Sequence, residues 1–198
     1  MNKYKFLLIL LLSSLITNGQ TCFHKNLSKT FNFKIELKRI KADSCKITLI
    51  VIEKKTLKNI QTIKLYSEFI FENDFKDCAT VRSYTNGINK NRISIDNDFG
   101  DFIVADFNFD GKEDFAIKKD SGGNGGPVYS YFIQNNNSKF IFDNYLSNTM
   151  EFFPRKINNT KKTLTTLVHA NAYEKCKKVY KYNSKTRKWK VISKTFVK

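Results

Sequence analysis

Residues 102–118 read FIVADFNFDGKEDFAIK, an acidic loop with an apolar run on each side. The runs 102–105 and 115–118 are rich in β-branched and aromatic residues, which favours two short strands. No long segment elsewhere shows the apolar period of a helix. This stretch therefore predicts a strand–loop–strand hairpin in an all-β body.

The rest of the chain indicates more strands. Residues 31–38 alternate between apolar and polar side chains, as a half-buried strand does, and several later runs have the same character. Turn signals such as NNNS at 135–138 and NSKT at 183–186 separate them. We expect antiparallel strands in a propeller-like or sandwich body. The further strands are expected at 47–52, 60–65, 128–133, 139–142, 163–170, 177–182 and 188–193.

The N-terminus has the pattern of an export signal. A short basic start is followed by an apolar run at 6–16, which is too short to span a bilayer. Cleavage after Gly19 gives a signal peptide at 1–19 and a single all-β domain at 20–198, in a periplasmic or secreted protein without a membrane span. Lipid anchoring at Cys22 is the alternative, but Thr21 is not the small residue that lipidation needs directly before the cysteine.

Cysteines and charge narrow the class of protein further. The four cysteines are an even number, which in an oxidising compartment favours two disulfides, with three pairings open and free thiols as the alternative. The net charge of +17 attracts anionic surfaces or acidic proteins. Export argues against nucleic acid as the target, and the lysines are scattered along the chain.

The acidic loop has the spacing of a calcium site. Calcium takes about six to eight oxygen ligands, and side chains at alternate positions converge where a chain wraps around the ion. Gly111 permits the sharp turn. Position twelve of the loop is Ile117, where a helical calcium loop has glutamate, so this loop joins strands. We expect a structural Ca²⁺ that also holds the neighbouring chain in place, bound by Asp106, Asn108, Asp110, the carbonyl of Lys112, and Asp114.

A glycine-rich segment, SGGNGGPVY, follows at 121–129. Four glycines in five residues favour an irregular loop. The segment is either a flexible turn or a protruding loop that enters a partner's cleft, where the lack of side chains permits close backbone approach. The residues expected to contact a partner are Ser121, Gly122, Gly123, Asn124, Gly125 and Tyr129.

No catalytic constellation stands out. His24 lies near the start of the mature chain, His169 lies in an apolar strand, and Ser121 has no evident base. Carboxylates at 96, 98 and 101 are explained equally well by turn composition. We therefore expect a binding protein and not an enzyme.

The region 102–131 carries a family resemblance. Its DFNFDGKEDFAI hairpin resembles the calcium hairpins of FG-GAP and integrin-type propeller blades. Together with the glycine-rich loop, Tyr129-x-Tyr131 and the ending with Cys176 and Trp189, it is similar to exported calcium-binding proteins of Gram-negative bacteria. That group includes immunity proteins that neutralise secreted peptidoglycan-hydrolase effectors.

This resemblance implies a function. Periplasmic lysozyme inhibitors insert a Ser-Gly-x-x-Tyr loop into the lysozyme cleft, and Ser121-Gly122 with Tyr129 is similar at a longer spacing. The implied partner is a peptidoglycan hydrolase or lysozyme-like protein, which this chain inhibits. The alternative is a calcium-stabilised cell-surface or cell-wall binding module without inhibitory activity.

Overall fold

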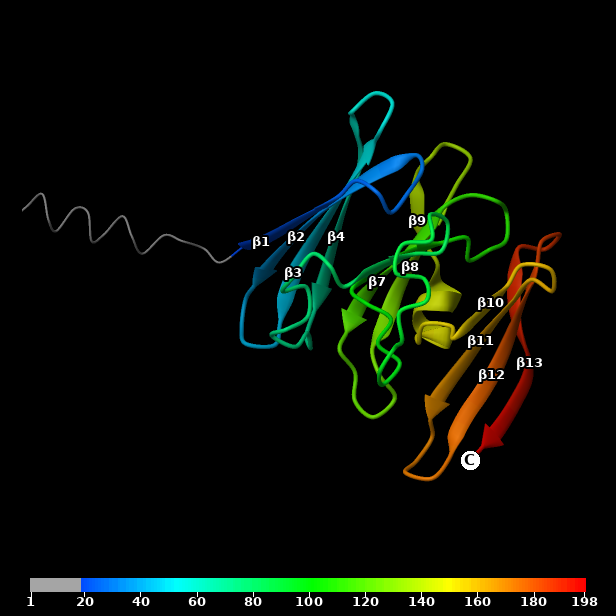
Figure 1. Ribbon diagram of the computed structural model, residues 1–198. Coiled ribbons are helices and arrows are strands. Elements are labelled where there is room, and N and C mark those ends of the chain that lie inside the picture. The colour runs from blue at the N-terminus through cyan, green and yellow to red at the C-terminus, as the bar shows by residue number, and fades with distance from the viewer. Residues whose placement is uncertain (1–18) are drawn as a thin grey trace, which may run out of the picture.

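The computed structural model describes residues 19–198 and shows an all-β chain of three sheets, seen in Figure 1. Residues 1–18 of the expected signal peptide lie outside the described residues. Sheet A contains β1 (Gly19–His24), β2 (Phe31–Arg39), β3 (Cys45–Glu53) and β4 (Asn59–Ser67). Sheet B contains β5 (Val81–Ser83), β6 (Phe102–Ala105), β7 (Asp114–Asp120), β8 (Val128–Gln134) and β9 (Phe140–Phe142). Sheet C contains β10 (Lys156–Asn158), β11 (Thr163–His169), β12 (Lys175–Asn183) and β13 (Lys188–Val197).

The strands follow one another in space in the order of the sequence. Sheets A and C are antiparallel meanders, and in sheet B only the β5–β6 pair is parallel. Short connections between neighbouring strands permit this arrangement. A helical turn, η2 (Leu146–Met150), follows β9 and leads towards sheet C.

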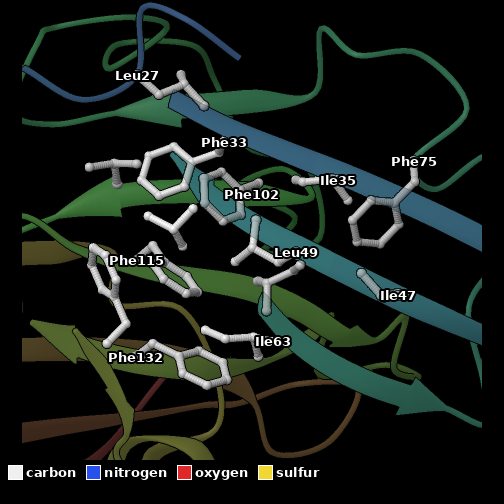
Figure 2. Close-up of a cluster of buried hydrophobic side chains, with 14 of the residues drawn as sticks. Leu27, Phe33, Ile35, Ile47, Leu49, Ile63, Phe75, Phe102, Phe115 and Phe132 are labelled. Atoms are coloured by element: carbon white, nitrogen blue, oxygen red, sulfur yellow. The ribbon is translucent and has the colours of Figure 1, made fainter. Parts of the chain in front are cut away.

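Sheet B lies between the other two sheets, and each of its faces covers a separate core (Figure 1). Figure 2 shows the core between sheets A and B, where the Phe33 and Phe102 ring centroids are 4.9 Å apart. The core between sheets B and C contains Phe107 and Tyr131, whose centroids are 5.1 Å apart. Each fully buried aromatic side chain contributes about 1.5–3 kcal/mol. The body is therefore a layered sandwich stabilised by aromatic packing.

The predicted all-β sandwich is confirmed, and so are most of the predicted strands. The 31–38 alternation becomes β2, whose Phe31, Phe33, Ile35 and Leu37 are all buried. Three short strands were not predicted, namely β1, β5 and β10. Two of them have only three residues, too few to show a period.

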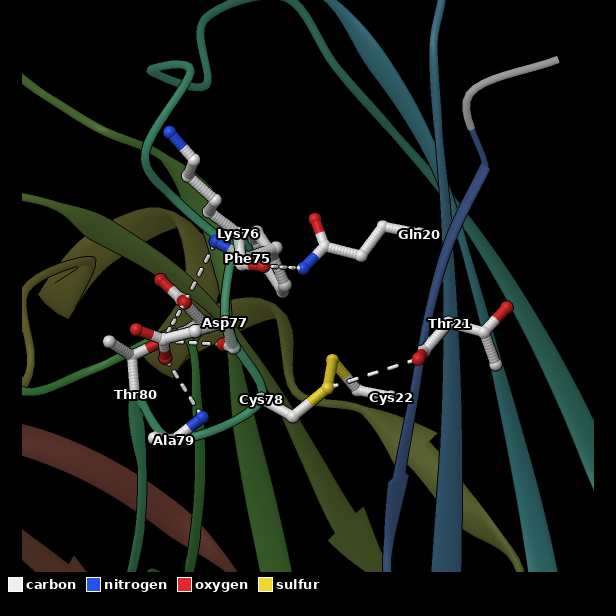
Figure 3. The surroundings of a disulfide bond; sticks show 10 residues. Gln20, Thr21, Cys22, Phe75, Lys76, Asp77, Cys78, Ala79 and Thr80 are labelled. Carbon is white, nitrogen blue, oxygen red and sulfur yellow. Dashed lines mark hydrogen bonds between the residues drawn. A yellow bond between two sulfur atoms is a disulfide. The ribbon is translucent and has the colours of Figure 1, made fainter. Parts of the chain in front are cut away.

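The cysteine prediction needs a correction, because the structure holds one disulfide and not two. Figure 3 shows Cys22 on β1 bonded to Cys78 in the segment before β5. Cys45 is buried on β3 in sheet A, whereas Cys176 is on β12 in sheet C, with sheet B between them. A bond between these two cysteines is ruled out by their separation. Among residues 19–198, no helix has the length and apolar character needed to cross a bilayer.

Candidate functional site

The acidic loop connects β6 to β7 in the predicted hairpin. Ala105 pairs with Asp114 and closes the loop. Phe109 and Gly111 have positive φ angles of 59° and 85°, so the chain turns sharply twice within three residues. Phe107 points into the core and is fully buried. The loop is therefore a tight, anchored structure.

The oxygen atoms of the loop side chains converge on shared backbone donors. The Asp110 N–H donates both to Asp106 Oδ1 and to Asn108 Oδ1, each at 3.1 Å. The Gly111 N–H donates to Asp106 Oδ2 at 2.8 Å, and the Lys112 N–H donates to Asp110 Oδ1 at 2.9 Å. Three of the five predicted ligand residues thus have their side-chain oxygens on the inside of the turn.

Asp114 accepts its hydrogen bonds from a different set of N–H groups and so also has a role in the packing. Its side chain is fully buried, and its two carboxylate oxygens accept N–H groups of Phe107 at 2.8 Å and Gln134 at 2.9 Å. Burial raises the pKa of Asp114 well above its usual value, although these N–H groups oppose the shift. Asp114 therefore braces the loop against β8.

The charges of the loop are incompletely balanced. Burial raises the pKa of Asp106, and the charge of Asp110 adds to the shift. The Lys112 ammonium lies 3.6 Å from Asp110 and donates to Asn136 Oδ1 at 2.7 Å. Within residues 19–198, no three His, Cys, Asp or Glu side chains gather closely enough to hold a metal by themselves. An ion in this loop therefore needs the Asn108 amide and the Lys112 carbonyl as further donors.

Glu113 connects the loop to the rest of the molecule, a role that no local sequence pattern indicates. Its carboxylate accepts hydrogen bonds from the Ser28 hydroxyl, from the Lys29 N–H at 2.8 Å, and from the Thr85 hydroxyl at 3.1 Å. Ser28 and Lys29 lie between β1 and β2, and Thr85 follows β5. The loop is thereby tied to both sheets A and B.

The glycine-rich segment lies at the opposite end of β7. The strand has seven residues, so at about 3.3 Å per residue the two loops are roughly 20 Å apart. Figure 1 shows the chain leaving β7 on the side away from the acidic loop. The expectation that an ion in the acidic loop directly holds the neighbouring chain therefore needs correction, because β7 separates the two.

Backbone geometry makes the glycine-rich loop rigid. Gly122 and Gly126 have φ angles of 68° and 91°, and a Cβ on Gly122 would lie 2.0 Å from the Gly126 carbonyl oxygen. Gly125 is half-buried against Phe152. Gly123 and Asn124 are exposed. These two residues form the tip of the loop.

The two hydroxyl residues predicted to contact a partner are inside the protein. Ser121 is 5% exposed; its hydroxyl donates to the Asp74 carboxylate and accepts the Phe71 N–H at 2.8 Å. The Tyr129 side chain is fully buried, and its hydroxyl accepts the Phe99 N–H at 3.2 Å. Both residues position the loop and leave its tip as the surface that a partner can reach.

An ion-pair cluster centred on the buried Lys118 contacts the glycine-rich loop. The Lys118 ammonium is 2.6 Å from Asp74, 2.9 Å from Asp98 and 2.9 Å from Asp101. Burial alone would lower the pKa of Lys118, but the three carboxylates raise it well above its usual value. Because Asp74 also accepts the Ser121 hydroxyl, the cluster and the glycine-rich loop form one unit.

Comparisons with known proteins give one similar fold. No family model matches the chain, and no curated protein is similar to it in sequence. A solved structure described as a Xanthomonas Type IV Secretion System related protein superposes with a TM-score of 0.55 and 14% sequence identity. The match covers 92% of this chain and 83% of that chain, and at this identity it shows the likeness of fold alone.

Proposed function

We propose that this chain is an exported calcium-binding protein that binds and inhibits a peptidoglycan hydrolase, as an inhibitor or immunity protein and not as an enzyme. The Cys22–Cys78 disulfide supports an oxidising compartment. The solved protein of similar fold is described as secretion-system related, which supports a role outside the cytoplasm. The observation that carries the proposal is the rigid glycine-rich loop with its exposed tip.

Calcium is the structural part of this proposal. The side-chain oxygens of Asp106 and Asn108 share the Asp110 N–H, and the Asp110 carboxylate accepts the Lys112 N–H in the same turn. These residues, the Lys112 carbonyl and Asp114 would hold the ion, and Asp114 would also keep the loop closed against β8. A bound Ca²⁺ supplies two positive charges that offset the repulsion between Asp106 and Asp110. Its role is to stabilise the fold.

The proposed contact surface combines the loop tip with the β11–β12 turn. We define the loop-tip surface as Gly123, Asn124, Asn171 and Tyr173. A recess of about 520 Å³ lies between the tip and this turn. The Tyr173 side chain is 87% exposed, and exposed tyrosines are frequent anchors in protein interfaces. The net charge of +17 favours an acidic partner surface, such as the carboxylate-lined cleft of a hydrolase.

An inhibition assay against a panel of purified lysozyme-like and other peptidoglycan hydrolases tests the proposal. We expect the wild-type protein to inhibit at least one enzyme. Gly123→Glu should weaken that inhibition at least about tenfold, because it puts a bulky carboxylate in the contact. A Cβ on Gly123 has no atom within 4 Å, so the thermal unfolding temperature should not change.

The matched control is Asn148→Glu, which adds the same charge at an exposed position outside the loop-tip surface. It should inhibit as the wild type does. The proposal fails if the wild type inhibits no enzyme of the panel, or if both variants lose inhibition equally. The calcium part fails separately if adding Ca²⁺ to chelator-treated protein leaves its unfolding temperature unchanged.

A further inference from the structure

A cleft of about 700 Å³ opens at the acidic-loop end of the molecule, between sheets B and C. Its walls come from the acidic loop, the β8–β9 turn, β9 itself, the β12–β13 turn, and Lys162 of the β10–β11 turn. Three predicted calcium ligands, Asn108, Asp110 and Lys112, line it, but the sequence did not indicate the other walls, because those segments are far from the acidic loop in the sequence. Besides two carboxylates and two isoleucines, its lining has aromatic rings, amides and cations.

The aromatic part of the wall is backed by Trp189. The Trp189 ring lies 6.1 Å from the Phe109 ring and 4.9 Å from the Tyr182 ring, measured between centroids. Trp189 itself is buried, whereas Phe109 and Tyr182 both line the cleft. Phe142, 42% exposed, adds a further ring from β9. These three lining rings supply the aromatic surface that a sugar-binding site uses.

Amide side chains line the cleft in unusual number. Five residues, Asn108, Gln134, Asn135, Asn136 and Asn137, contribute to its wall. The Gln134 and Asn137 side chains make no hydrogen bond with any other residue between 19 and 198. Each amide both donates and accepts hydrogen bonds, so these two are free to bind hydroxyl and N-acetyl groups of a ligand.

The charges at the cleft favour an anion. The two lining carboxylates are engaged by the protein: Asp110 accepts the Lys112 N–H at 2.9 Å, and Asp143 accepts the Leu146 N–H at 2.8 Å. Arg187 lines the cleft and has no ion-pair partner within the described part of the chain. A guanidinium without a partner is well suited to a two-point contact with a carboxylate.

We propose that this cleft binds an oligosaccharide that carries both N-acetyl and carboxylate groups. In this arrangement the rings of Phe109 and Tyr182 contact sugar faces, Gln134 and Asn137 bind polar substituents, and Arg187 binds the carboxylate. The edge strand β9 also lines the cleft, so an acidic peptide is the competing ligand, but it brings no sugar ring to the side chains of Phe109 and Tyr182. The site goes beyond hydrolase inhibition, because it would attach the protein to a glycan surface.

Calorimetric titration with two tetrasaccharides of the same length tests the proposal. One alternates N-acetylglucosamine with N-acetylmuramic acid, and the other, chitotetraose, lacks the carboxylates. We expect the carboxylated tetrasaccharide to bind at least about tenfold more tightly, because only it can pair with Arg187. Equal affinity for the two sugars, no binding of either, or tighter binding of a hexaglutamate peptide would overturn the proposal.

Variants in the β12–β13 turn locate the site. Arg187→Gln should weaken binding of the carboxylated sugar about tenfold and leave chitotetraose unaffected. Lys185→Gln removes a positive charge from the same turn outside the cleft wall and should have no effect. Gly123→Glu, at the other end of the molecule, should bind the sugar as the wild type does. Glycan binding and hydrolase inhibition can therefore fail independently.

Discussion

Replacing Lys118 by methionine should destabilise the protein strongly. The Lys118 side chain is 1% exposed, and its ammonium is within 3 Å of three carboxylates. Methionine fills a similar volume but takes the ammonium away from the buried Asp101 and from Asp74, whose side chain is 13% exposed. Asp98 is 43% exposed and can be solvated by water. Removing one partner of a buried ion pair costs about 3–5 kcal/mol, and we expect a loss in this range.

The dependence of this loss on pH gives the sharper test. Burial already raises the pKa of Asp101, and Lys118 opposes that shift. Without the ammonium the folded-state pKa of Asp101 rises further above its unfolded value. The folded variant then binds a proton more tightly than the unfolded chain does, so its stability increases as the pH falls through the folded pKa. The loss of unfolding free energy relative to wild type should therefore be smaller at about pH 5 than at about pH 8.

Urea unfolding followed by tryptophan fluorescence measures both effects. Lys119→Met, at the exposed neighbouring position on β7, is the matched control and should change stability by less than about 0.5 kcal/mol. A deficit of the same size at both pH values would refute the argument that unpaired carboxylates cause it. A deficit no larger than that of the control would refute the role of the cluster.

Two further predictions concern the connections between segments. Replacing Cys22 and Cys78 by serine removes a disulfide between residues 56 positions apart. This should lower the free energy of unfolding by about 4 kcal/mol, measured by urea unfolding of the variant and the wild type. Glu113→Ala removes the acceptor for Ser28, Lys29 and Thr85 and should cost about 2–3 kcal/mol, with a smaller loss for Glu113→Gln, which keeps one amide oxygen. An unchanged midpoint for either variant would contradict these roles.

Local patterns in the sequence predict much of the fold. The alternation in β2 and the β-branched runs of β3 and β6 place these strands correctly, because one buried face imposes a period of two. The missing glutamate at Ile117 correctly excludes a helical calcium loop, since Ile117 lies in β7. Such inferences succeed where the structure is determined by residues that are close together in the sequence.

Long-range contacts are beyond this kind of prediction. Asp74 and Lys118 form an ion pair across 44 residues of sequence, and neither has a local pattern that indicates a partner. The burial of Ser121 and Tyr129 has the same origin, because the packing of other segments decides it. The pairing of Cys22 with Cys78 likewise follows from the contact of β1 with the segment before β5.

β7 connects the two ends of the molecule and also keeps them separate. At the start of β7, the acidic loop is held by Asp114 and Glu113. At the end of β7, the glycine-rich loop is held by Lys118 and Ser121. The two groups share no hydrogen-bond partner, and sites more than about 7–10 Å apart without shared partners usually act additively. An ion in the acidic loop can then influence the loop tip only through the stability of the whole fold. The same separation would let the proposed glycan site at one end and the proposed protein-binding loop at the other change independently.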